Sequence, residues 1–92
     1  MLSIIVPTYN EADNIGPLVE AIFAATVGAG IDTEVIVVDD SSPDGTAEVA
    51  DALKTRYRIS VIRRNGVRGL SASVIDGFAR ASGDILCVMD AD

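Results

Sequence analysis

The sequence predicts an α/β domain, a mostly parallel sheet with flanking helices in the order βαβαβαβ. Four short apolar runs rich in β-branched residues lack polar alternation, which is typical of strands buried on both faces; they cover residues 2–6, 34–38, 59–62 and 85–89. Helical periodicity fills the intervals between them, and strands that alternate with helices form parallel sheets through right-handed crossovers. The chain has 92 residues, and 49% of them are hydrophobic. Residues 1–92 are therefore expected to form one domain with one hydrophobic core.

The first helix is predicted between the first two strands. Its apolar stripe consists of Ile15, Leu18, Val19, Ile22 and Phe23. Pro17 falls in the first turn, where proline is tolerated, and Gly28 and Gly30 are expected to end the helix.

The second helix is expected to start with Ser42 as N-cap and Pro43 at the first helical position. One face would carry Val49, Ala50, Leu53 and Tyr57.

The third helix is predicted over residues 70–81, although Gly77 lowers its helical propensity. Its apolar residues are Leu70, Val74, Ile75, Phe78 and Ala79. Gly83 then leads into the last strand, in which Cys87 is expected to be a small core residue.

Composition excludes several classes of function. The 14 acidic and 7 basic residues give a net charge of −7, which disfavours binding to nucleic acid. Without His and with one Cys, the chain cannot form a Ser/His/Asp site, a zinc cluster or an internal disulfide. The first apolar run is too short for a signal peptide or membrane span, so a cytoplasmic location is expected.

Acidic residues follow three of the predicted strands. They are Glu11, Asp39, Asp40, Asp90 and Asp92. In a parallel sheet these positions share one edge, where ligands bind at the point of strand-order reversal. Crowded carboxylates favour a hard divalent ion, Mg²⁺ or Mn²⁺. The structural alternative is that such aspartates cap helices and fill turns, as Asp44 would in its Ser-Pro-Asp-Gly turn.

Four segments also carry a family resemblance: PTYNE, VVDDSSPDGT, RGLSASVIDGF and GDILCVMDAD. Together they resemble the amino-terminal half of family 2 glycosyltransferases, in the dolichol-phosphate mannose synthase branch. The resemblance implies the Rossmann-like nucleotide-binding half of a GT-A fold. It also implies metal-dependent, inverting transfer of mannose from GDP-mannose to a dolichyl or other polyprenyl phosphate, at the cytoplasmic face of the membrane.

The resemblance also assigns residues. It places at the nucleotide sugar Pro7, Tyr9, Glu11, Val38, Asp40, Arg68, Asp90, Ala91 and Asp92. Within that set, Val38 and Asp40 would lie beside the base and ribose, and Arg68 would reach the diphosphate. Asp90 and Asp92 would hold the metal and serve as the catalytic pair. Arg63 and Arg64 are interpreted as solvated loop charges.

Other readings remain open. A phospho-receiver domain also gathers aspartates around Mg²⁺. In such a domain the acidic pair follows the first strand, whereas here it follows the second, and the PTYNE segment has no counterpart. An inactive nucleotide-binding or assembly module fits the short chain. A dinucleotide-dependent oxidoreductase is the weakest alternative, because the Gly28-x-Gly30 pair ends a helix.

Two expectations follow from the chain length. Family members continue past the Asp-x-Asp pair with the acceptor site, so the isolated chain is expected to be inactive. With strand order three-two-one-four, the run 85–89 forms an apolar sheet edge through which the chain is expected to self-associate.

Overall fold

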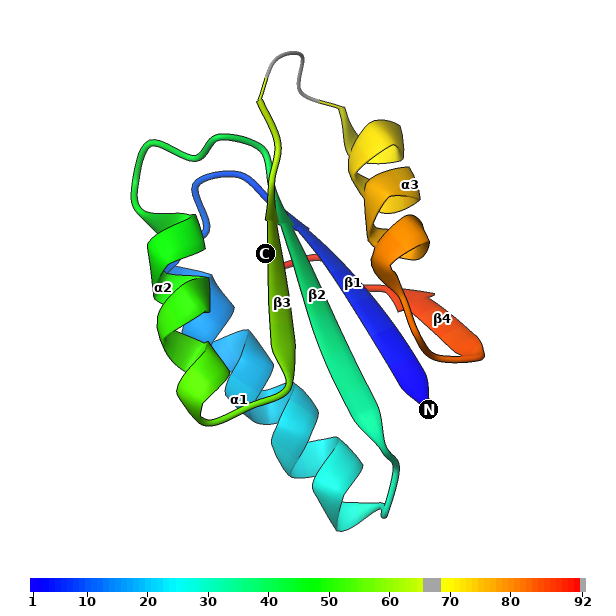
Figure 1. Ribbon diagram of the computed structural model, residues 1–92. Coiled ribbons are helices and arrows are strands. Elements are labelled where there is room, and N and C mark those ends of the chain that lie inside the picture. The colour runs from blue at the N-terminus through cyan, green and yellow to red at the C-terminus, as the bar shows by residue number, and fades with distance from the viewer. Residues whose placement is uncertain (66–68, 92) are drawn as a thin grey trace.

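A computed structural model describes residues 1–65 and 69–91, with the side chains of residues 70 and 71 left out. The predicted alternation of strands and helices is confirmed (Figure 1). The elements are β1 (Leu2–Thr8), α1 (Ala12–Gly28), β2 (Thr33–Asp39), α2 (Thr46–Ala52), the 3₁₀ turn η1 (Leu53–Thr55), β3 (Ile59–Arg63), α3 (Leu70–Arg80) and β4 (Ile85–Val88).

All four strands are parallel and lie in the order β3-β2-β1-β4, which confirms the predicted order. In register, Leu2 pairs with Thr33 of β2 on one side and with Ile85 of β4 on the other. Helices α1 and α2 cover one face of the sheet and α3 covers the other (Figure 1). The strand order reverses between β1 and β4, so this is the position where a ligand is expected.

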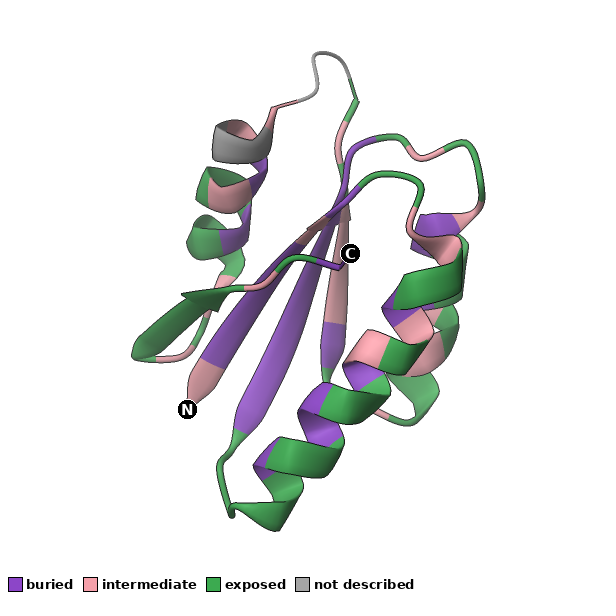
Figure 2. Ribbon diagram, turned by 180° about the vertical axis from the view of Figure 1, so that it is seen from behind, coloured by how far each residue is buried: buried purple, intermediate pink, exposed green. Residues whose placement is uncertain are grey.

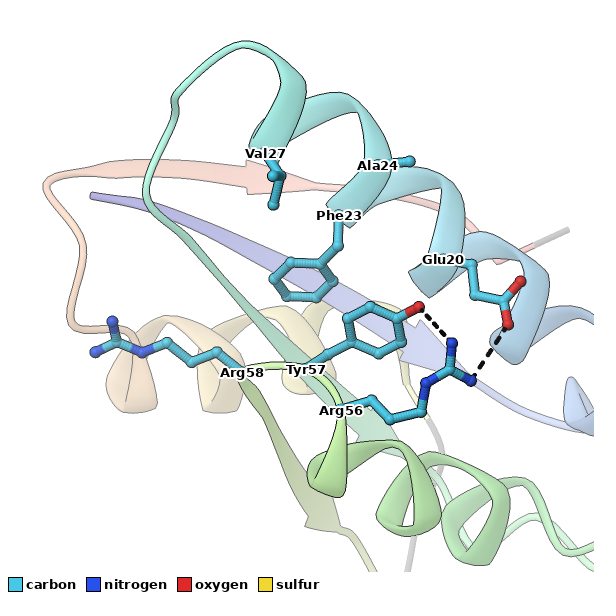
Figure 3. Close-up of a pocket in the computed structure, with 7 residues that line it drawn as sticks. All are labelled: Glu20, Phe23, Ala24, Val27, Arg56, Tyr57 and Arg58. Carbon is cyan, nitrogen blue, oxygen red and sulfur yellow. Dashed lines mark hydrogen bonds and ion pairs between the residues drawn. The ribbon is translucent and has the colours of Figure 1, made fainter.

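The first helix buries the predicted stripe. Its buried residues are Ile15, Val19, Ile22, Phe23 and Thr26, and Leu18 packs against the same cluster. The ring of Phe23 stacks on Tyr57 with 5.0 Å between centroids (Figure 3). Gly30, with φ of 71°, lets the chain turn out of the helix while its N–H donates to the carbonyl of Val27.

The predicted start of the second helix is wrong. Helix α2 begins at Thr46, because Gly45 has φ of 85° and interrupts any helix that started earlier. Ser42 does not cap it, since its hydroxyl donates to Asp39. Leu53 lies in the 3₁₀ turn η1, and Tyr57 follows that turn.

The predicted apolar face of the third helix is also wrong. Helix α3 turns its small residues Ser73 and Gly77 to the sheet, whereas Ile75 is 65% exposed and Phe78 is 41% exposed. Gly77 lies so close to β1 that an added Cβ would stand 2.6 Å from Cγ2 of Ile5. The close approach of helix and strand, rather than apolar periodicity, therefore selects the buried face.

Strand β4 is not covered on both faces as expected. All its residues are exposed (Figure 2), because in the described part of the chain β4 packs mainly against β1 and no helix covers it closely. The expectation that Cys87 is a core residue is therefore wrong, since Cys87 is exposed on this strand.

Candidate functional site

The loops that follow β1 and β2 are tied together by Asp44. Its Oδ2 accepts from the N–H of Ala12 at 3.1 Å, and its Oδ1 accepts from the N–H of Thr46 at 3.1 Å and from the Thr46 hydroxyl. The hydrogen bond from that hydroxyl is the main reason that the pKa of Asp44 lies below its usual value. Asp44 thus joins the first residues of α1 and α2, which bears out the capping interpretation for this residue.

Asp39 has a similar structural role. It is 2% exposed, and its Oδ1 accepts from the hydroxyls of Thr8 at 2.7 Å and Ser42 at 2.6 Å. Its Oδ2 accepts from the N–H of Ser42 at 3.0 Å. The Ser42 hydroxyl also accepts from the N–H of Asn10 at 2.9 Å, so Asp39 organises both loops at the carboxyl ends of β1 and β2.

Asp40 is the second buried carboxylate of this edge, 8% exposed. Its Oδ1 accepts from Nη1 of Arg64, and its Oδ2 accepts from the hydroxyl of Ser73 at 3.0 Å and from the N–H of Gly69 at 3.3 Å. Arg64 in turn donates through Nε to Asp76 at 2.7 Å. Asp40 thereby connects β2 to the segment after β3 and to α3.

The interpretation of Arg64 as a solvated loop charge is wrong. Its side chain is 16% exposed, and hydrogen bonds to Asp40 and then to Asp76 raise the pKa of its guanidinium. Arg63 agrees better with that interpretation, because its side chain is 49% exposed and pairs with Asp51 on the surface. The signal in the sequence for a site role is the position of Arg64 directly after β3, at the same sheet edge as Asp40.

A cavity of about 280 Å³ lies at the carboxyl ends of β1 and β4, and it is lined by Pro7, Val88, Met89 and Asp90. This is the point where the strand order reverses. Asp90 is exposed at its rim, whereas Ala91 is 4% exposed and packs into the core beneath α1. The sheet therefore presents a hollow and a carboxylate where a ligand is expected.

The other expected site residues are distributed around this edge. Tyr9 is 40% exposed on the loop after β1. Glu11 precedes α1, and its Oε2 accepts from the side chain of Asn14 at 2.8 Å. Val38 is wholly buried against Ile5 and Ile36, and it lies in the central strand β2, so the structure does not expose it to a ligand. Arg68 and Asp92 lie outside the described residues.

The four of these acidic residues that the structure describes, Glu11, Asp39, Asp40 and Asp90, do not come together as the expected metal-holding cluster. Among residues 1–65 and 69–91, no group of three His, Cys, Asp or Glu side chains is arranged to hold a metal. Asp39 and Asp40 are instead hydrogen-bonded to their own chain.

A second cavity, of about 410 Å³, lies at the opposite end of the strands (Figure 3). Its lining includes Phe23, Tyr57 and Arg58, and Arg58 immediately precedes β3. Arg56 lies over the Tyr57 ring at 5.1 Å and pairs with Glu20 at 3.8 Å. This cavity is therefore separate from the carboxyl edge of the sheet.

Residues 3–92 match the model of the family described as Glycosyl transferase family 2, and the chain belongs to this family. It is 50% identical over 91 residues to a dolichol-phosphate mannosyltransferase of Pyrococcus furiosus, covering 99% of this chain and 25% of that protein. It is 46% identical to a dolichol-phosphate mannosyltransferase of Saccharomyces cerevisiae, covering 98% of this chain and 34% of the yeast protein. The chain thus spans a quarter to a third of the length of these relatives.

Solved structures show the same fold. A mannosyltransferase from Pyrobaculum calidifontis, in complex with GDP-Man and Mn²⁺, superimposes with a TM-score of 0.84 at 28% identity, over 99% of this chain and 27% of that one. Mannosyl-3-phosphoglycerate synthase from Rubrobacter xylanophilus gives 0.82 at 25% identity, over 100% of this chain and 30% of that one. The predicted GT-A fold is confirmed. Within the described residues, no helix has the length and apolar character needed to span a membrane.

Proposed function

We propose that residues 1–92 form the donor-binding part of a mannosyltransferase that uses GDP-mannose and a dolichyl or other polyprenyl phosphate. The observation that carries this proposal is the cavity beside Pro7 and Asp90, because it lies at the strand-order reversal of a parallel sheet. Similarity to two dolichol-phosphate mannosyltransferases, and to a mannosyltransferase in complex with GDP-Man, supports the choice of donor and acceptor.

The nucleoside would bind over the loops after β1 and β2. The half-exposed ring of Tyr9 provides a stacking surface for the base. Asp40 and Glu11 would supply carboxylate acceptors for N–H or hydroxyl groups of the base and ribose, and the wholly buried Val38 would support this surface from within the sheet. Pro7 lines the same hollow as Asp90, which brings the nucleoside and the diphosphate to one edge.

The diphosphate would lie at the end of β4 beside Asp90, Ala91 and Asp92, with Arg68 as a cationic partner. Mg²⁺ and Mn²⁺ take oxygen ligands and are often held by one or two carboxylates together with substrate phosphates. The exposed Asp90 at the cavity rim fits that donor set. We therefore assign the metal to Asp90 and Asp92, where it would neutralise charge on the departing GDP.

The reaction we propose is a single displacement at the anomeric carbon. A phosphate oxygen of the acceptor forms the new bond to that carbon while the bond to the GDP oxygen breaks, so the configuration inverts and GDP leaves. The phosphate nucleophile is already anionic and needs no strong general base, which suits a half-domain without His. The acceptor site would belong to the part of the relatives that this chain does not cover.

Two further proposals concern the self-association of the chain and its location in the cell. We propose that the exposed strand β4 lets the 92-residue chain pair with a second copy, because a sheet edge offers unpaired backbone groups. We also propose a cytoplasmic location, at the membrane face in a full-length protein, where a polyprenyl phosphate is accessible.

Calorimetric titration tests the donor assignment. GDP-mannose and GDP should bind the chain in the presence of Mn²⁺, whereas inorganic phosphate at the same concentrations should give no heat. Acetyl phosphate should leave the chain unmodified, which separates this proposal from the phospho-receiver alternative. Failure of both GDP and GDP-mannose to bind would contradict the proposed function.

A further inference from the structure

Arg64 connects three elements at the carboxyl edge of the sheet. It directly follows β3, and its Nη1 donates to Asp40 at the end of β2. Its Nε donates to Asp76 of α3 at 2.7 Å, and Nη1 also lies 3.4 Å from the hydroxyl of Ser73. The guanidinium therefore spans two carboxylates, a geometry that a lysine ammonium cannot reproduce.

The backbone of Arg64 holds the residues on either side of Asp40. Its N–H donates to the carbonyl of Asp39 at 2.8 Å, and its own carbonyl accepts from the hydroxyl of Ser41. Ser41 has φ of 56°, a left-handed conformation that is costly for a residue other than glycine and needs such support. Main-chain and side-chain atoms of one residue thus locate both the backbone and the carboxylate of Asp40.

The contacts of Asp40 restrict what it can offer a ligand. A carboxylate accepts about four hydrogen bonds in all. Within the described residues, Ser73 and Gly69 donate to Oδ2, and Arg64 donates to Oδ1. These contacts hold the carboxylate in one orientation, and Oδ1 can accept one more hydrogen bond.

We propose that Arg64 is a positioning residue for donor binding, which with Asp76 orients Asp40 so that Oδ1 accepts a single N–H or O–H from the nucleoside. This inference rests on the proposed function, in which Asp40 contacts the base or ribose. The neighbouring ion pair of Arg63 and Asp51 provides a contrast. It links β3 to α2 at the surface and makes no contact with Asp40 that the structure records.

The test measures GDP affinity by calorimetry in the 92-residue chain with a metal chelator present, so that phosphate binding through the metal does not mask the nucleoside contact. Arg64→Lys should weaken binding about tenfold, the value of one charged hydrogen bond, and Asp76→Asn should weaken it to a smaller extent. In an Asp40→Asn background, Arg64→Lys should cause no further loss, since both changes remove the same contact. Arg63→Lys and Asp51→Asn are the matched controls and should leave the affinity unchanged.

The results that would overturn the positioning role differ from the result that would overturn the proposed function. Equal affinity of wild type and Arg64→Lys, or losses from Arg64→Lys and Asp40→Asn that add, would overturn the positioning role while leaving the proposed function intact. A wild-type chain that binds neither GDP nor GDP-mannose would instead overturn the proposed function. If Arg64→Lys does not fold, the half-exposed Asp76 gives the decisive variant: unchanged GDP affinity in Asp76→Asn would overturn the inference.

Discussion

Gly77 of α3 lies directly against Ile5 of β1, where an added Cβ would stand 2.6 Å from Cγ2 of Ile5. Ile5 is fully buried and sits between β2 and β4 in the sheet, so it cannot move aside. The contact sets the distance between helix and sheet. One turn earlier in the same helix, Ser73 is thereby brought within 3.0 Å of the Asp40 carboxylate.

We therefore expect Gly77→Ala to destabilise the domain by about 1–3 kcal/mol, through overpacking against Ile5. Urea denaturation followed by circular dichroism measures the change. Gly28→Ala is the control, because an added Cβ at Gly28, the last residue of α1, meets no atom within 4 Å. It should raise stability by up to about 1 kcal/mol through helix propensity. A Gly77→Ala variant as stable as wild type would show that α3 can shift away from the sheet.

The carboxylate of Glu34 leads us to expect that the free energy of unfolding depends on pH. It is buried at the start of β2, where its Oε2 accepts from the hydroxyl of Ser3 at 2.6 Å and from the N–H of Ser82 at 2.7 Å. Burial acts to raise its pKa, but these hydrogen bonds outweigh burial and leave the pKa below its ordinary value of 4.5. The carboxylate thus stabilises the fold above about pH 4.5, and this contribution is lost as the pH falls through the lowered value.

The measurement is the free energy of unfolding between pH 7 and pH 3. Glu34→Gln should reduce the acid-induced loss, and some loss should remain because Asp44 and Asp51 have pKa values shifted in the same direction. Glu20→Gln, at an exposed position of α1, should leave the curve as in wild type. The same pH curve for Glu34→Gln and wild type would argue against a role for Glu34.

From the position of Asp90 in the cavity we expect nucleotide binding to depend on a metal ion. Asp90→Ala should abolish the difference in GDP affinity between Mn²⁺ and chelator, because it removes a carboxylate at the rim of the cavity. Asp84→Ala, just before the other end of β4, is the control and should keep the difference. The same titrations with Mg²⁺ in place of Mn²⁺ show which of the two ions gives the higher GDP affinity. Identical binding of wild type with and without chelator would exclude the metal assignment.

From the exposed edge strand β4 we expect the chain to associate with itself. Val88 is 45% exposed on this edge, so Val88→Lys should shift the sedimentation profile toward monomer by placing a charge on the pairing strand. Ile31→Lys introduces the same charge at a position that is 47% exposed and outside β4, and it should leave association unchanged. A stable monomer of the wild-type chain at high concentration would contradict this prediction.

Local signals in the sequence were enough to predict the order of elements and to place the ends of each strand to within one or two residues. Apolar runs without alternation mark β1, β2 and β3, and the stripe from Ile15 to Phe23 marks α1, because in each the buried face is apolar and regularly spaced. The start of α2 was mispredicted because Ser42-Pro43 resembles a helix start while Gly45 two residues later has a positive φ. The edge position of β4 was predicted, but not how far that position would expose Cys87.

The sequence by itself determined the family, the parallel order and the carboxylates at the sheet edge, since these depend on residue types near one another in the chain. Only the tertiary structure decided what each carboxylate does. Asp39 and Asp40 are adjacent in sequence, yet one holds the loops of β1 and β2 and the other binds Arg64 and α3. Successive side chains at a strand end point to opposite sides, and their partners come from segments distant in the sequence, so no local pattern contains that division of roles.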